Sequence, residues 1–246
     1  MRILPLATFL GLSFIVLPAH SEPAEPQTES PIETFVDWFL EDKENLQSVA
    51  FAEVIQAVSG CEVLPVVPED AVDAEMLTVL TASLDTVLAE LSVSGNPIHQ
   101  VGRVNEISRH LENALMNELN QHEGYQCEVP LNASGKSQRS GYPDLRLLHE
   151  ASGRVFYIDP KVYKQGSEDS SFRTFYYEPQ RATNKVLDDA SHLIVGVAHS
   201  GKQEGMWRLD GWKLVDLVAF RVRLKAEFQA SNKQLYKESR IIGESE

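Results

Sequence analysis

The first 124 residues carry apolar side chains at the spacing of amphipathic helices. Apolar residues recur every three or four positions from Ile32 to about Val58, and again from Ala71 to Leu91. A third stretch of this kind, residues 102–124, follows the turn sequence of residues 94–97 and ends at Gly124. We expect helices over these stretches, each with one face in a hydrophobic core.

After residue 125 the pattern changes to short apolar segments that are typical of β-strands. Four such segments are bounded by turn residues: 126–131, 145–148, 155–158 and 193–198. Residues 182–190 are expected to form a helix before the last of them, and the aromatic and β-branched segment after residue 205 leads into a helix-compatible, basic C-terminal tail. This order predicts an α/β fold with a central mixed β-sheet flanked by helices. We divide the chain into a helical N-terminal segment, residues 32–95, and an α/β domain, residues 96–246.

The N-terminal residues have the composition of a signal peptide. One basic residue, Arg2, precedes an apolar run from Ile3 to Leu17, and Ala19 and Ser21 occupy the positions that a signal peptidase reads. The alternative is a membrane anchor, but the run is interrupted by proline and is shorter than the roughly 20 apolar residues of a spanning helix. We expect cleavage of residues 1–21, export to the periplasm or the medium, and no stable membrane association afterwards. Residues 22–31, rich in proline and acid, then form a flexible tether.

The net charge of -14 is distributed unevenly along the chain. Residues 22–131 hold three basic and 21 acidic residues, whereas residues 132–246 hold 18 basic and 15 acidic ones. A polyanionic partner is compatible with the second part, but its mild positive charge does not by itself establish nucleic-acid binding.

The two cysteines, Cys61 and Cys127, are interpreted in the light of export. An oxidising compartment allows them to pair, and a disulfide closing a loop of about 66 residues would stabilise the fold by about 4 kcal/mol. The alternative is two buried free thiols. The sequence has no CxxC motif and no Cys/His cluster that indicates zinc.

Two acidic phrases flank a predicted β-hairpin in the stretch GYPDLRLLHEASGRVFYIDPK, whose turn is at Ser152-Gly153. Asp144 precedes the first strand and Asp159 follows the second, so antiparallel pairing brings their carboxylates close together. Lys161 projects from the same strand face as Asp159. Two close carboxylates repel each other unless a cation lies between them, and a hard divalent ion with oxygen ligands fits that requirement. A nearby lysine can position or help to deprotonate a metal-bound water. The alternative is ordinary solvent-facing charge at two strand ends.

Pro143-Asp144 and Asp159-Pro160-Lys161 resemble the motif of the PD-(D/E)xK nuclease superfamily, which includes many type II restriction endonucleases. The resemblance covers roughly residues 100–230. It implies that Asp144, Asp159 and the carbonyl of Pro160 hold Mg²⁺ or Mn²⁺ and that Lys161 activates the attacking water. The family also takes a glutamate from the preceding helix, for which Glu106 is the best match and Glu112 and Glu118 are alternatives.

The resemblance implies a metal-dependent endonuclease that hydrolyses the phosphodiester bonds of DNA, and it leaves a homodimer open. Arg173, Arg181 and Lys185 are then candidates for phosphate contacts, although solvated surface charge explains each of them equally well.

Pro160 is the residue of the motif that argues against an active enzyme. Pro160 has no N–H for the sheet, which predicts either a bulged strand or an impaired enzyme. A catalytically impaired nuclease-like binding module in the periplasm is therefore the main alternative function, followed by an unrelated periplasmic metal hydrolase.

Overall fold

The computed structural model describes residues 30–171 and 175–243. The chain divides into two compact units, Met1–Lys43 and Glu44–Glu246. The predicted signal peptide, most of the predicted tether and Arg173 lie outside the described residues.

The described part of the first unit is helix α1, Pro31–Glu41, in the stretch where a helix was predicted. Its N-terminus is closed by reciprocal hydrogen bonds: the Ser30 Oγ accepts from the Glu33 N–H at 3.2 Å, and the Ser30 N–H donates to Glu33 Oε2 at 2.9 Å. Pro31 occupies the first turn, where a missing N–H costs no hydrogen bond.

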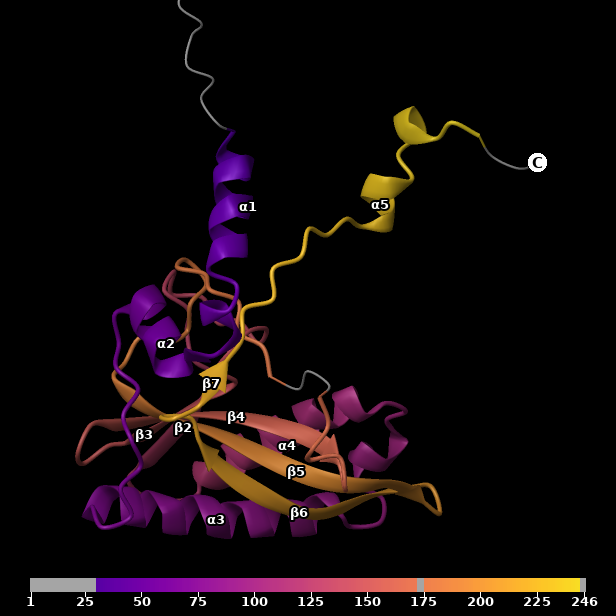
Figure 1. Cartoon of the computed structure of the whole chain (residues 1–246). Coiled ribbons are helices and arrows are strands. Elements are labelled where there is room, and N and C mark those ends of the chain that lie inside the picture. Colours follow the sequence, from indigo (N-terminus) through magenta and orange to yellow (C-terminus); the bar gives the residue numbers. More distant parts are fainter. Residues whose placement is uncertain (1–29, 172–174, 244–246) are drawn as a thin grey trace, which may run out of the picture. The chain divides into compact units, whose positions relative to one another are not determined.

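The second unit is built on a five-stranded mixed sheet with the strand order β2-β3-β4-β5-β6 (Figure 1). Strands β4 and β5 are parallel and the other neighbours are antiparallel, which confirms the predicted fold class. The strands span Tyr125–Glu128, Leu145–His149, Arg154–Lys164, Ala190–Gln203 and Met206–Asp216. A small second sheet pairs β1, Val49–Ala50, with β7, Arg221–Val222.

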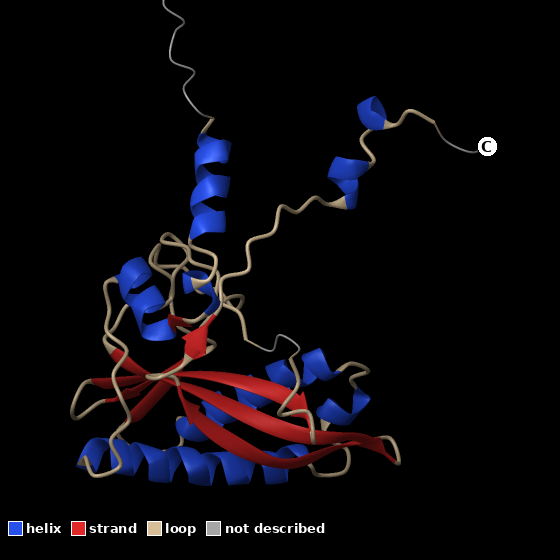
Figure 2. Ribbon diagram, viewed as in Figure 1, coloured by secondary structure: helices blue, strands red, loops and turns tan. Residues whose placement is uncertain are grey.

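Helices cover both faces of the sheet, as the ribbon colours in Figure 2 make clear. Helices α3, Ala71–Leu91, and α4, Val104–Leu119, contribute their apolar stripes to one core together with alternate residues of the strands, such as Phe156 and Ile158. Helix α2, Phe51–Ser59, packs on the opposite face beside Tyr157. Helices α3 and α4, which lie on either side of residue 95 in the sequence, share this core. The remaining helical turns are Asn45–Gln47, Pro97–Gln100, Asn232–Leu235 (α5) and Glu238–Arg240.

Residues 182–190 do not form the predicted helix; they run in turns and extended backbone into β5. The side chain of Asn184 competes with helical bonding, since its Oδ1 accepts from the Val186 N–H at 3.2 Å and its Nδ2 donates to the Val186 carbonyl at 2.9 Å. The helix-compatible C-terminal tail is likewise helical only at its two short turns.

Strand β4 runs through Pro160 without a bulge. Its pairing with β5 is continuous from Val155 to Lys164, whereas its pairing with β3 ends at Ile158. At Pro160 the strand therefore has one neighbour within the described sheet, which makes a residue without an N–H easier to accommodate.

Both cysteines are free, so the predicted disulfide is wrong. Cys127 lies in the core on the α3–α4 face of the sheet, whereas Cys61 packs against the cluster on the opposite face, and the sheet separates the two thiols. Burial raises the pKa of Cys127 to about 12, so this thiol stays protonated at neutral pH.

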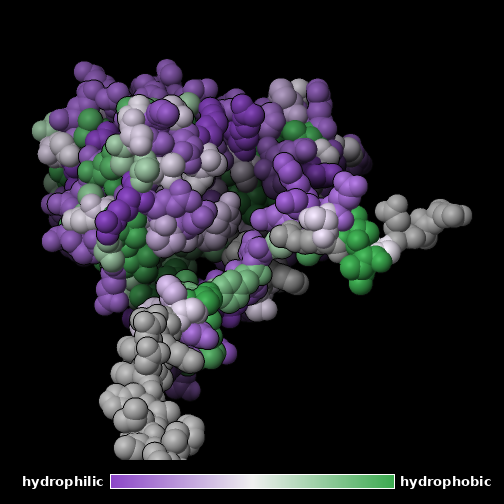
Figure 3. Space-filling view, turned by 90° about the horizontal axis from the view of Figure 1, so that it is seen from above, coloured by the Kyte–Doolittle hydropathy of each residue, from purple (hydrophilic) through white to green (hydrophobic). Residues whose placement is uncertain are grey.

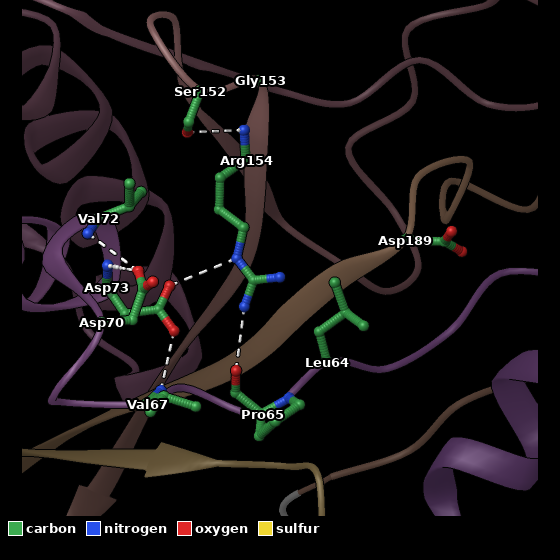
Figure 4. A pocket seen from close by; sticks show the side chains of 10 residues that line it. All are labelled: Leu64, Pro65, Val67, Asp70, Val72, Asp73, Ser152, Gly153, Arg154 and Asp189. Carbon is green, nitrogen blue, oxygen red and sulfur yellow. Dashed lines mark hydrogen bonds and ion pairs between the residues drawn. The ribbon is translucent and has the colours of Figure 1, made fainter.

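Arg154, at the start of β4, fastens the N-terminus of α3 to the sheet (Figure 4). Its guanidinium donates to the Pro65 carbonyl at 3.0 Å and the Ser191 Oγ at 2.8 Å, and contacts Asp73 Oδ1 at 3.4 Å. Asp73 Oδ2 also accepts from the Val67 N–H at 2.8 Å. Arg154, Asp73 and Pro65 are among the residues that line the pocket in Figure 4. Because the charges of Arg154 and Asp73 compensate each other, we assign this pocket a structural role.

On the face shown in Figure 3 most residues are hydrophilic, with smaller hydrophobic patches between them. Among the described residues, no helix has the length and apolar character required to cross a bilayer.

Candidate active site

Asp144, Asp159 and Lys161 meet at the open end of the β3–β4 hairpin. The last strand pair is Leu145 with Ile158, so the next residue on each side places Asp144 opposite Asp159. The Lys161 Nζ lies 2.5 Å from Asp159 Oδ2 and 3.5 Å from Asp144 Oδ2. The structure thus brings together the three residues that the sequence motif identified.

An aromatic cluster forms the wall behind these carboxylates. Tyr142, which precedes the cis peptide bond to Pro143, makes a 2.7 Å hydrogen bond between its hydroxyl and His192 Nδ1. Both side chains are buried among edge-to-face aromatic rings, so the chain just before Asp144 is held in a close-packed setting. The rings in contact there are Phe51, Tyr142, Tyr157, Phe175, Tyr177, His192 and Phe220.

Burial makes the charged state of Asp159 costly. Its side chain is 3% exposed, and burial together with the negative charge of Asp144 raises the pKa of Asp159 to about 7, although Lys161 opposes the shift. For Lys161, burial acts to lower the pKa, but Asp159 and Asp144 outweigh it and the net shift is upward. Asp159 Oδ2 is buried and, despite its short contact with the lysine, has no hydrogen bond of good geometry.

Glu106 does not reach this site. Its Oε2 accepts hydrogen bonds from the N–H groups of Gly102, at 3.1 Å, and Arg103, at 3.3 Å, so it closes the N-terminus of α4. The assignment of Glu106 to the site is therefore corrected.

Glu112, one of the two alternatives on the same helix, lies within electrostatic reach of Asp144 instead. Burial, and then the charge of Asp144, raise the pKa of Glu112 to about 6, while Arg139, Lys161 and Lys185 act in the opposite direction. Arg139 Nη1 is 3.9 Å from Glu112 Oε2. Glu106 and Glu112 are six positions apart, and at about 100° of rotation per residue they lie on different faces of the helix. This explains why only one of them can point to the site.

The three cations predicted to contact phosphate have different surroundings. Arg181 is exposed, as a phosphate contact requires, and Arg173 is not described. Lys185 is 1% exposed, and its Nζ donates to the Gln138 carbonyl at 3.4 Å. Burial lowers the pKa of Lys185, whereas Asp144, Asp159 and Glu112 act to raise it. The expectation of a surface position for Lys185 is corrected, because the residue lies inside, within electrostatic reach of the carboxylates.

The donor set fits a hard divalent cation. Two carboxylates and the Pro160 carbonyl supply oxygen alone, and Mg²⁺ characteristically takes one or two protein carboxylates and completes its shell with water and substrate phosphate. In the described ranges no group of three or more His, Cys, Asp or Glu side chains is placed to hold a metal ion. The buried Asp159 Oδ2 makes no well-formed hydrogen bond, and its 2.5 Å contact with the Lys161 ammonium shows that this oxygen already accommodates a cation.

A mixed five-stranded sheet with this carboxylate and lysine cluster at its hairpin defines a restriction endonuclease-like protein. Comparison with known proteins agrees: the model of the type II restriction enzyme MjaV family matches residues 44–239. The chain is also 32% identical over 214 residues to the type II restriction enzyme MjaV of Methanocaldococcus jannaschii, which covers 82% of this chain and 90% of that relative. The chain belongs to the type II restriction enzyme MjaV family. The resemblance drawn from Pro143-Asp144 and Asp159-Pro160-Lys161 is confirmed, and membership supports a DNA nuclease.

Proposed function

We propose that this protein is an endonuclease that hydrolyses phosphodiester bonds of DNA with Mg²⁺, or Mn²⁺, as cofactor. The observation that carries the proposal is the meeting of Asp144, Asp159 and Lys161 at the end of the β3–β4 hairpin. The family match supports DNA as the substrate, because the relative is a type II restriction enzyme.

Each residue of the cluster has a role that its surroundings support. Asp144, Asp159 and the Pro160 carbonyl would hold the cation, which when bound would neutralise charge on the phosphoryl oxygens and make a bound water more acidic. The Lys161 ammonium lies within hydrogen-bond distance of Asp159. It orients the attacking water and stabilises the charge that develops on the phosphoryl group.

Glu112 supplies a third carboxylate at the edge of the cluster. With its pKa raised to about 6, it is largely ionised at neutral pH and accepts a hydrogen bond from a water that approaches the phosphate. Arg181, which is exposed, contacts the DNA backbone and contributes to affinity without reading sequence.

Cleavage of supercoiled plasmid with Mg²⁺ or with EDTA tests the proposed activity. Nicked or linear product is expected with Mg²⁺ and none with EDTA. If several DNA and RNA substrates all stay intact with Mg²⁺ and with Mn²⁺, the enzyme proposal fails and a nuclease-like binding module becomes the better account.

We also propose that the protein is exported to the periplasm or secreted after cleavage near residue 21. The support is the sequence of residues 1–21, with its basic start, apolar run and small-residue exit. N-terminal sequencing of the protein recovered from cell fractions tests this. A mature N-terminus close to Glu22 in the exported fraction is expected, and an intact Met1 in the cytosol contradicts export.

A further inference from the structure

A second lysine lies on the same face of the sheet as Lys161, two strands away. Lys161 of β4 is paired with Gly196 of β5, and Gly196 is paired with Lys213 of β6, so the three residues form a row across neighbouring strands (Figure 1). Residues paired in this way project from one face of the sheet. Two strand spacings separate the backbones of the two lysines, which is about 10 Å.

The glycine in the middle of this row makes room for an aromatic ring. Tyr163 follows Lys161 by two positions and therefore projects from the same face. A Cβ added at Gly196 would lie 3.2 Å from Tyr163 Cε1 and 3.6 Å from its Cδ1, so the ring occupies the space of a side chain on β5. A glycine inside a strand often marks such a close approach.

Tyr163 and Glu168 together place the Lys213 ammonium. The Lys213 Nζ is 5.9 Å from the centre of the Tyr163 ring and donates a hydrogen bond to Glu168 Oε1 at 3.1 Å. The side chains of Lys213 and Glu168 are 61% and 41% exposed. An ion pair this exposed contributes little to stability, because both charges remain hydrated and are screened by salt. Another anion can therefore replace Glu168 at small cost.

The backbone of a DNA strand supplies anions at a suitable spacing. Each strand of a duplex carries one phosphate per about 3.4 Å of helix axis. When the scissile phosphate lies at the Lys161 ammonium and the DNA strand crosses β5, a phosphate within about three nucleotides of it comes within reach of the Lys213 side chain. The positive charges of the two lysines complement this partner.

We propose that Lys213 binds a DNA phosphate close to the scissile one, and that Glu168 holds this ammonium in the free protein and is displaced when DNA binds. This inference rests on the proposed function and extends its site from the β3–β4 hairpin across β5 to β6. A contact of this kind adds affinity and fixes the position of the DNA without reading its sequence.

Single-turnover cleavage of plasmid with Mg²⁺ at rising protein concentration tests the contact. Lys213→Met keeps the aliphatic stem and removes the charge, so the half-saturating protein concentration should rise about tenfold, as expected for a lost charged hydrogen bond. The slope of log affinity against log salt should become shallower by about one. Glu168→Gln removes the competing anion and should lower the half-saturating concentration about threefold.

Two further variants serve as controls. Lys213→Arg keeps the charge and should retain most of the affinity. Lys164→Met removes an equal charge from β4, but its side chain alternates to the other face of the sheet, so its half-saturating concentration should equal that of the wild type.

Opposite shifts in the Lys213→Met and Glu168→Gln variants are what the proposal requires, and a merely structural role of the ion pair would weaken DNA binding in both. An unchanged half-saturating concentration in Lys213→Met, or a higher one in Glu168→Gln, would overturn it, as would equal shifts in Lys213→Met and Lys164→Met. If the wild-type protein cleaves no plasmid, the proposed function fails and this inference falls with it. If the wild type cleaves and the variants match it, the inference alone fails.

Discussion

Asp144 lies across from Asp159, one residue beyond the last pair of the β3–β4 hairpin, with the Lys161 ammonium within 3.5 Å of both carboxylates. This arrangement follows from register alone, because the strand pairing that buries Ile158 also fixes the two acids opposite each other. It creates a buried site whose negative charge is only partly neutralised by the protein, and such a site attracts a divalent cation.

The two aspartates are expected to be metal ligands. Asp144→Asn and Asp159→Asn should each weaken Mg²⁺ binding by at least the roughly 10- to 100-fold loss seen when outer-shell partners of metal ligands are removed. Isothermal titration measures this. Asp169→Asn, an exposed acid in a nearby loop, is the matched control and should bind as the wild type does. Unaltered titration curves for both site variants would contradict the ligand assignment.

Substitutions of two glutamates on α4 should have different effects, one on cleavage activity and the other on stability. Glu112→Gln is expected to slow plasmid cleavage without loss of stability, since it removes a carboxylate that burial and Asp144 already disfavour. Glu106→Ala should cost about 1 kcal/mol of unfolding free energy through the lost helix cap, with cleavage by the folded protein retained. Urea unfolding and initial cleavage rates measure the two effects. Equal loss of cleavage in both variants would show that Glu106 belongs to the site after all.

His192 should give the protein a specific pH dependence. Burial lowers the pKa of His192 to about 3, so the folded protein keeps this ring neutral while the unfolded chain protonates it below about pH 6.5. The stability from the neutral ring is complete above pH 6.5 and is lost as the pH falls towards the folded-state pKa, by up to about 1.4 kcal/mol per pH unit.

Unfolding free energies measured between pH 7 and pH 4 test this point. His192→Asn, which cannot take up the proton, should show a shallower decline than the wild type. Parallel curves for the two proteins would mean that another group causes the pH dependence.

The fold was predictable where one local pattern decides it. The stripe on α3 and the turn at Ser152-Gly153 each specify an element, and antiparallel pairing then predicts the meeting of Asp144 with Asp159. The helix predicted over residues 182–190 fails because the side chain of Asn184 binds the backbone of Val186.

The rest of the site depends on tertiary packing. The rotation of α4 about its own axis, relative to the sheet, decides whether Glu106 or Glu112 lies near the site. A sequence pattern does not reveal that rotation. The burial of Lys185 likewise arises from residues distant in sequence, Gln138 and Asp144 among them. The free cysteines have the same origin, since only the finished sheet shows that Cys61 and Cys127 lie on opposite faces.

The central claim is that Lys161 and the two aspartates form the catalytic centre, and single-turnover plasmid cleavage with Mg²⁺ tests it most directly. Lys161→Ala should fold normally by circular dichroism and cleave at least about 100-fold more slowly, the scale of a lost proton-transfer or water-positioning group. Lys164→Ala, which removes an exposed lysine from the same strand, should cleave at the wild-type rate. Near-normal cleavage by Lys161→Ala would contradict the account.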